Sequence, residues 1–300
     1  MRMPPQLAVP SSSLAVTDEV RKLLRAASVR GQIPTPKSQI IACSHLVEIG
    51  ELDLALYEES VAERTFGLFY KAMSKVRGFF DRRTKQLYVD PTLHDLKRTF
   101  VTYHEVIHRI ATWQHIRCTE DDDLTISVEC ETLFEAEANY GAAEILFQCD
   151  TFENEAKDFD LSIASALYLA QKYDASRHSS LRRFVERNHR PCLLLILKET
   201  RRQNDHGAIS FYISYAIPSD SFTARFGDPL DSVLIDPFIN PDHELGHILN
   251  NGKSGEIALT DRNGFSRTCS VECCTNSYHT FVLIHPKDLP ASRKTVQFRL

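Results

Sequence analysis

Two histidines and a glutamate at residues 104–108 have the residue types and the spacing best suited to chemistry in this chain. His104 and His108 are four positions apart, in a segment whose apolar residues recur every three or four positions, which predicts a helix. Residues i and i+4 lie on one face of a helix, so both imidazoles can bind one metal ion. Glu105 can then accept a proton from a water molecule on that ion. This pattern is typical of a hydrolytic zinc site.

The same His-Glu-x-x-His pattern recurs at residues 243–247, so the pattern alone does not identify the site. The second copy lies on a short predicted helix between Pro241 and Gly252. Its start at Asp242-His243 and its stop at Gly252 have the chemistry of helix caps, which needs no metal. We therefore expect the first copy to hold the metal and the second to have arisen by chance.

Zinc held by two histidines needs a third protein ligand and an open position for water. In metzincins the third ligand is a histidine six residues after the second one, beyond a glycine that turns the chain. Here His115 is seven residues past His108, and Ala111 replaces the glycine. The third ligand must therefore come from another segment.

A second long helix, predicted over residues 128–148, offers carboxylates for this position. Extending its apolar stripe backwards by threes and fours reaches polar residues, whereas Glu137 and Glu144 point elsewhere. A carboxylate and an amide on a buried face are costly unless they are engaged. Glu135 as third ligand, with Asn139 holding a ligating side chain, would explain both. Glu131 is the alternative ligand, and a helix acid satisfied by backbone amides is the alternative without metal. The stripe residues are Ala138, Ala142, Ile145, Leu146 and Cys149, followed backwards by Asn139, Glu135 and Glu131.

These segments resemble the ImmA/IrrE family of metallopeptidases. The resemblance rests on residues 98–108 (RTFVTYHEVIH), the acidic segment at residues 121–124, and residues 135–143 (EAEANYGAA). In that family the first Glu of an E-x-E-A-N helix is the third zinc ligand. The resemblance thus implies zinc ligands at His104, His108 and Glu135, with Glu105 as the catalytic base. It also implies one Zn²⁺ per chain, with Mn²⁺ as an alternative activating metal.

The predicted fold class is α+β, with a zincin-like domain of helices and a small antiparallel sheet at residues 17–150. Residues 1–16 are rich in Pro and Ser and are expected to be disordered. Helices are predicted from Asp18 to Val29, from Pro36 to about Ile49, and from Pro91 through His108. Short aromatic and β-branched runs separated by a polar turn predict the strands of the sheet. These runs are Phe66–Tyr70, Arg77–Phe80 and Gln86–Val89.

Residues 151–190 predict two helices with a tight turn, a spacing like that of a helix-turn-helix. The second helix carries basic residues that can face phosphates, although most basic helix faces are simply solvated. A different composition begins at Pro191, with strands at residues 192–197, 209–217 and 280–284. By its similarity to the longer IrrE-type proteases, residues 191–300 are expected to form a GAF-like α/β sensor domain. The candidate nucleic-acid contacts are Arg177, Arg182, Arg183 and Arg187.

Composition indicates a soluble, cytoplasmic protein whose main partners are proteins. The chain of 300 residues is 43% hydrophobic and 25% charged, with a net charge of −5, which argues against a protein that coats nucleic acid. No apolar run approaches the roughly 20 residues that a membrane helix needs, and the start lacks a signal-peptide core. Eight scattered cysteines without a Cys-x-x-Cys pair indicate reduced thiols.

The resemblance implies that the substrate is a helix-turn-helix, XRE-like repressor, whose cleavage derepresses stress-response or mobile-element genes. The C-terminal regions would respond to DNA or to a small-molecule signal. Two alternatives remain open on the sequence. One is a non-proteolytic DNA-binding or ligand-sensing transcriptional regulator, and the other is a general cytoplasmic peptidase. The presence of Glu105 argues against the first alternative, since a degenerate site has no reason to keep the base.

Overall fold

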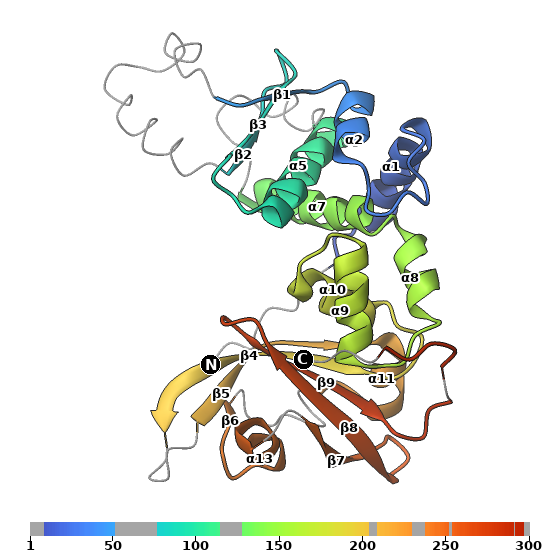
Figure 1. The fold of residues 1–300 in the computed structure, drawn as a ribbon, viewed down its shortest axis with the longest axis vertical. Coiled ribbons are helices and arrows are strands. Elements are labelled where there is room, and N and C mark those ends of the chain that lie inside the picture. The colour runs from blue at the N-terminus through green and yellow to red at the C-terminus, as the bar shows by residue number, and fades with distance from the viewer. Residues whose placement is uncertain are drawn as a thin grey trace. The chain divides into compact units, whose positions relative to one another are not determined.

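The computed structural model divides the chain into two compact units, Val9–Thr151 and Phe152–Leu300 (Figure 1). The residues that the structure describes are 9–51, 77–114, 128–203, 209–229, 238–251, 254–290 and 292–296. The expected run Phe66–Tyr70 and the acidic segment at residues 121–124 lie outside them. The mixture of helices and antiparallel strands confirms the α+β class.

The first unit is built around two long helices, α5 (Asp95–Ile110) and α7 (Val128–Leu146), which pack against each other. Their close approach depends on Gly141, where a Cβ atom would lie 2.5 Å from Cδ1 of Ile107. Helix α1 (Ser13–Ala26) packs on α7, and α2 (Lys37–Cys43) packs on α5. The apolar residues Val20, Tyr103 and Ala138 are fully buried between these helices.

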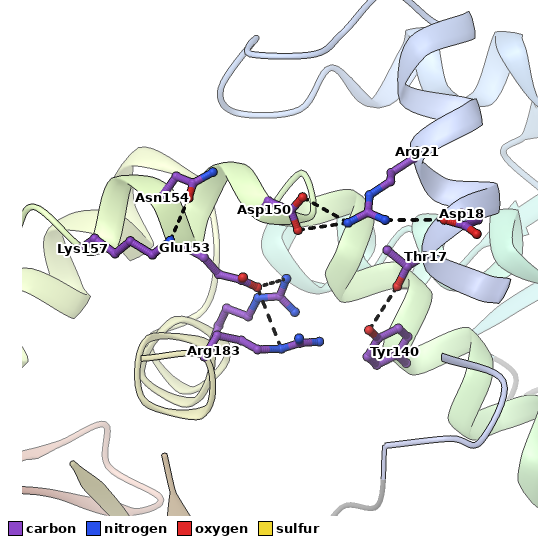
Figure 2. Close-up of polar contacts among 10 residues, drawn as sticks. Thr17, Asp18, Arg21, Tyr140, Asp150, Glu153, Asn154, Lys157 and Arg183 are labelled. Atoms are coloured by element: carbon purple, nitrogen blue, oxygen red, sulfur yellow. Dashed lines mark hydrogen bonds and ion pairs between the residues drawn. The ribbon is translucent and has the colours of Figure 1, made fainter. Parts of the chain in front are cut away.

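Polar contacts hold α1 against α7 and the turn that follows it (Figure 2). The hydroxyl groups of Thr17 and Tyr140 lie 3.1 Å apart. Arg21 donates to both carboxylate oxygens of Asp150, at 3.0 and 3.2 Å. Such exposed ion pairs stabilise a protein only weakly, so they contribute mainly to the position of α1.

Residues 1–16 were expected to be disordered and the first helix to begin at Asp18. This is wrong in part, because α1 begins at Ser13. The side chains of Val16 and Thr17 are buried, so this stretch is already part of the packed unit.

Helix α2 is also shorter than expected. It ends at Cys43, and two residues later His45 takes a left-handed backbone conformation with φ of 56°. The amide of Leu46 donates to the carbonyl of Ile41, which makes this a Schellman-type helix end.

A three-stranded sheet lies beside α5 and has the order β1-β3-β2. Its strands are β1 (Val47–Ile49), β2 (Gly78–Phe80) and β3 (Gln86–Val89). Strands β2 and β3 are antiparallel as predicted, but β1 is parallel to β3, so the sheet is mixed. After β3, the carboxylate of Asp90 accepts hydrogen bonds from the amide and hydroxyl of Thr92. This turn delays the start of α5 from the expected Pro91 to Asp95.

The second unit is a six-stranded antiparallel sheet with helices on both faces (Figure 1). The strand order is β6-β5-β4-β9-β8-β7. All of its strand pairs are antiparallel, and the expected GAF-like character of residues 191–300 stays a prediction. The strands are β4 (Leu193–Gln203), β5 (Ile209–Pro218), β6 (Phe238–Ile239), β7 (Ser254–Thr260), β8 (Ser266–Thr275) and β9 (Thr280–Pro286).

Helices α11 (Asp220–Phe226) and α13 (Glu244–Asn251) pack on one face of this sheet. Phe222, Phe226 and Leu245 share a buried core there with alternate residues of β4. Helices α9 (Ile163–Lys172) and α10 (Arg177–Glu186) contact strands β4, β5 and β8. Strand β4 is therefore covered on both faces, which explains its continuous apolar sequence.

Of residues 151–190, expected as a separate helix-turn-helix-like region, all but Thr151 belong to the same compact unit as the sheet. They contain the two expected helices, α9 and α10, together with a helix that the sequence reading missed, α8 (Asp150–Ala156). The backbone amide of Ile163 donates to Glu272 on β8, and Phe159 forms a β-bridge with Lys294. No helix within the described ranges is long and apolar enough to cross a membrane.

Candidate metal centre

Helix α5 presents both histidines of the first His-Glu-x-x-His pattern on one face. The ring centroids of His104 and His108 are 4.9 Å apart, and their Nε2 atoms are 3.2 Å apart. Both side chains are largely buried, at 15% and 18% exposed. The i, i+4 spacing therefore directs both imidazole nitrogens to one point, as the sequence predicted.

Helix α7 brings Glu135 to the same point. Its Oε2 lies 3.3 Å from Nε2 of His104, and its Oε1 lies 3.5 Å from Nε2 of His108. The Glu135 side chain is 55% exposed, so the argument that it must be engaged because it is buried is wrong. Its position facing the histidines, and not its burial, is what marks it as a ligand candidate.

The separations of these donor atoms fit a tetrahedral zinc ion. With Zn–N and Zn–O bonds of about 2.0–2.1 Å, two ligand atoms of a tetrahedron are about 3.3–3.4 Å apart. The two imidazole nitrogens are 3.2 Å apart, and they lie 3.3 and 3.5 Å from the carboxylate oxygens of Glu135 that face them. Two nitrogens and two carboxylate oxygens this close repel one another unless protons or a cation lie between them. Two nitrogens and one carboxylate oxygen are also a donor set that zinc prefers.

The other nitrogen of each imidazole has an oxygen partner. Nδ1 of His104 lies 3.2 Å from Oδ1 of Asn139, the residue expected to hold a ligating side chain. Nδ1 of His108 lies 2.9 Å from Oε1 of Gln114. Since an oxygen can only accept, each Nδ1 carries a proton, and each imidazole in its neutral form then keeps the Nε2 lone pair that a metal needs.

Glu105 lies on the same helix as the histidines and is 9% exposed. Burial raises the pKa of its carboxyl group above the ordinary value, although His104 and His108 oppose that increase. Strand β2 passes close to it: a Cβ atom on Gly78 would lie 2.7 Å from Oε1 of Glu105 and 2.4 Å from Val101. Glycine at this position leaves the room that the carboxylate occupies, next to the two histidines.

The charges of the site are coupled through Glu135. Hydrogen bonds with His104 and His108 hold the pKa of the Glu135 carboxyl group well below its ordinary value. Burial favours neutral His108, but hydrogen bonds with Glu135 and Gln114 outweigh it and raise the pKa of His108. The carboxylate of Glu135 is therefore ionised at neutral pH, which is the form that binds a metal.

The second His-Glu-x-x-His copy does not form a comparable site. Nδ1 of His243 accepts from the amide of Leu245, so this histidine caps α13. Gly246 packs against the backbone of Asn240, where a Cβ atom would lie 2.0 Å from the carbonyl oxygen. Among the described residues, His104, His108 and Glu135 form the only group of three potential ligands close enough to share an ion. His115 and the side chain of Glu131 lie outside the described residues.

Two of the arginines expected to contact nucleic acid are tied to an acid on α8. Arg183 is 6% exposed, and its guanidinium group lies 2.9 Å from Oε1 of Glu153 (Figure 2). Arg187 lies 3.9 Å from the same carboxylate oxygen. The buried, paired Arg183 cannot face a phosphate, so this part of the expectation is wrong.

The other two arginines also have partners within the protein. Arg182 lies 3.3 Å from Glu186, one turn along α10. Arg177 donates to the carbonyl oxygen of Thr275 at 3.4 Å. Contact of Arg177, Arg182 and Arg187 with nucleic acid stays a prediction.

The sequence reading missed three residues next to the site, Gln114, Trp113 and Glu137. They follow one another in space: Gln114 contacts His108, and both Gln114 and Trp113 donate to Glu137. The sequence placed Glu137 off the buried face of α7, and this expectation is wrong, because its side chain is 1% exposed. One available signal was that a buried acid on an alanine-rich helix needs several donors, and the Trp-Gln pair just after α5 supplies them.

Comparisons with known proteins found a family model and a similar fold. Residues 60–184 match the family model Peptidase_M78, described as the IrrE N-terminal-like domain. A search of curated proteins found no match. A solved structure described as a Mycobacterium tuberculosis transcriptional regulator has the same fold, with a TM-score of 0.50 and 11% sequence identity. The similarity covers 91% of this chain and 76% of that chain.

Proposed function

The chain carries an IrrE N-terminal-like domain of the ImmA/IrrE metallopeptidases, and we propose that it is a zinc endopeptidase that cleaves a helix-turn-helix repressor. The observation that carries the proposal is the convergence of His104, His108 and Glu135 at separations that suit tetrahedral zinc. Cleavage would derepress the genes that the repressor silences, as in stress or mobile-element responses.

In this proposal His104, His108 and Glu135 would hold the metal. A zinc ion bound there would lower the pKa of its water to about 7 and polarise the scissile carbonyl group. Glu105 accepts the proton of the attacking water and passes it to the leaving amine. Its buried position beside the histidines and its raised pKa suit a group that must both take and release a proton.

The repressor substrate is proposed from the family domain, and the fold similarity adds modest support. The structural neighbour is described as a transcriptional regulator, which favours a role in transcriptional control. A regulator without protease activity is the competing proposal. Against it stand the intact Glu105 and the burial of Arg183, which is paired with Glu153.

The direct test is to incubate the purified protein with a candidate repressor, with and without a zinc chelator. Cleavage at one peptide bond that stops with the chelator and returns with zinc supports the proposal. A general peptidase would also cut unrelated unfolded proteins under the same conditions. A protein that binds DNA and leaves every repressor intact would support the regulator instead.

We expect Asn139→Ala to weaken zinc binding or activity by about 10- to 100-fold, which is the usual effect of losing a residue that orients a metal ligand. The reason is that Asn139 accepts from Nδ1 of His104 and so fixes that imidazole. Zinc affinity can be measured by competition with a chromogenic chelator. Asn154→Ala, on α8 in the second unit, is the control and should leave affinity unchanged. Equal affinities for the unaltered protein and Asn139→Ala would show that Asn139 has no such role.

We propose that the unit Phe152–Leu300 regulates or recruits and does not cut. All proposed catalytic residues lie in the unit Val9–Thr151. A chain that ends at Thr151 should therefore keep zinc binding but change either its basal rate or its response to a signal. A coupling free energy of about 1–3 kcal/mol is typical of such control. Identical cleavage by the short and full chains under all conditions would contradict a regulatory role.

A further inference from the structure

Glu137 is a buried carboxylate next to the metal centre that the proposed reaction does not use. It is 1% exposed and accepts hydrogen bonds from three side chains. Trp113 Nε1 and Gln114 Nε2 both donate to its Oε2, at 3.0 and 2.7 Å. The hydroxyl of Ser12 donates to its Oε1. Burying an acid in this way is costly, so the three donors must hold it in one position.

Ser12 bonds to Glu137 and not to the backbone of the helix that it precedes. Ser12 is the N-cap residue of α1, a position where serine normally accepts a hydrogen bond from the helix backbone. Its side chain makes no such capping bond and instead donates to Glu137. The segment that precedes α1 thus contributes to the surroundings of the metal centre.

The donors and acceptors in this cluster leave one orientation for Gln114. A carboxylate can only accept, so the atom of Gln114 that faces Glu137 must be its NH₂ group. The carbonyl Oε1 of Gln114 is then turned toward His108, and it lies 2.9 Å from Nδ1. Gln114 is fully buried, so no water competes for either end of its amide. Nδ1 of His108 must therefore carry the proton.

From this chain of contacts we infer that Glu137 is a positioning residue for the metal centre: through Gln114 it fixes the tautomer and ring orientation of His108. Without an acceptor at the Oε2 position, the Gln114 amide can flip and present NH₂ to Nδ1. That arrangement favours the wrong imidazole tautomer and turns the Nε2 lone pair away from the metal. The inference rests on the proposed function, because it assigns a role toward the metal that His108 would bind.

The inference requires an acceptor at position 137 and not a charge. Glutamine can keep its own carbonyl oxygen where Oε2 now accepts from Trp113 and Gln114, and its NH₂ group can donate to the Ser12 hydroxyl. Glu137→Gln should therefore bind zinc as tightly as the unaltered protein. Glu137→Leu removes the acceptor and should weaken binding about 10- to 100-fold, the usual effect of losing a group that orients a ligand.

The test measures zinc affinity in five full-length proteins by chelator competition. They are the unaltered chain, Glu137→Gln, Glu137→Leu, Gln114→Leu and the double variant Gln114→Leu/Glu137→Leu. Because Glu137 acts through Gln114, the double variant should lose no more affinity than Gln114→Leu alone. Glu144→Leu is the matched control, since Glu144 is equally buried on α7 and about 10 Å farther along the helix.

Three results would overturn the inference. These are an unchanged affinity in Glu137→Leu, a loss in Glu137→Gln as large as that in Glu137→Leu, and additive losses in the double variant. If Glu137→Leu does not fold, proton NMR of the zinc-loaded protein decides the matter. The Nδ1 proton of His108 should be protected from exchange in the unaltered chain and in Glu137→Gln, and exposed in Gln114→Leu. Equal protection in all three would overturn the inference. An unaltered chain that binds no zinc would instead refute the proposed function.

Discussion

Glu105→Gln should reduce repressor cleavage by about 100- to 10,000-fold, the usual contribution of a general acid–base group, while zinc binding stays unchanged. Glutamine has the shape of glutamate but cannot take a proton from water. Glu105 is not among the three convergent donor atoms, so its loss removes no ligand. Because the replaced carboxylate is buried, the neutral side chain should not lower the melting temperature.

The measurement is a single-turnover cleavage rate together with zinc content and a thermal melt of the same preparation. Glu244→Gln is the matched control, since it makes the same change in the second His-Glu-x-x-His copy and should cut normally. A Glu105→Gln protein that cleaves the repressor at the original rate would refute the proposed mechanism.

Replacing any one of His104, His108 and Glu135 by alanine should weaken zinc binding by more than about 100-fold. Residues that merely orient a ligand already contribute 10- to 100-fold, and a ligand itself contributes more. The loss should appear as zinc content near zero after dialysis and as loss of cleavage. His243→Ala and His247→Ala should keep one zinc per chain, because His243 serves as a helix cap.

The opposite pattern, with zinc lost in His247→Ala and kept in His104→Ala, would show that the second copy is the metal site. If only Glu135→Ala keeps its zinc, the two histidines remain ligands and Glu135 is not one. Glu131, the alternative from the sequence, would then be the candidate for the third ligand.

The sequence identified the two histidines by a local rule and Glu135 by resemblance to a known family. The i, i+4 relation of His104 and His108 depends only on helix geometry, and α5 is a regular helix. Glu135 was found through the resemblance of residues 135–143 to the E-x-E-A-N helix of a known family, since the apolar stripe placed it on the wrong face of α7. The reason given for Glu135 was nevertheless wrong, since the apolar stripe did not predict its exposure.

Gln114 and Glu137 could not be found by such rules, because they meet only in the folded chain. Helix α5 ends at Ile110, and Ala111 leaves the helical conformation with ψ of 77°. This break turns Trp113 and Gln114 toward a helix that begins after a further segment of chain. Gln114 and Glu137 are 23 positions apart, so their contact depends on tertiary packing, which the periodicity of a sequence does not predict.

The expected contact of Arg183 with nucleic acid was wrong for a related reason. The spacing of the arginines on α10 was read correctly, but Glu153, the partner of Arg183, lies on α8, a helix that was not predicted. A sequence shows which residues are charged and not which opposite charge folding will bring to them. Similarly, β1 was expected to be part of a helix. A left-handed residue at His45 ends α2 early, and the sequence has no glycine there that would have predicted this helix end.

The most direct test of the central claim is anomalous diffraction at the zinc absorption edge from crystals of the zinc-loaded protein. We expect one strong peak per chain, about 2.0–2.2 Å from Nε2 of His104, Nε2 of His108 and a carboxylate oxygen of Glu135. A peak at His243 and His247, or no peak at the three convergent side chains in protein that cleaves its repressor, would contradict the account.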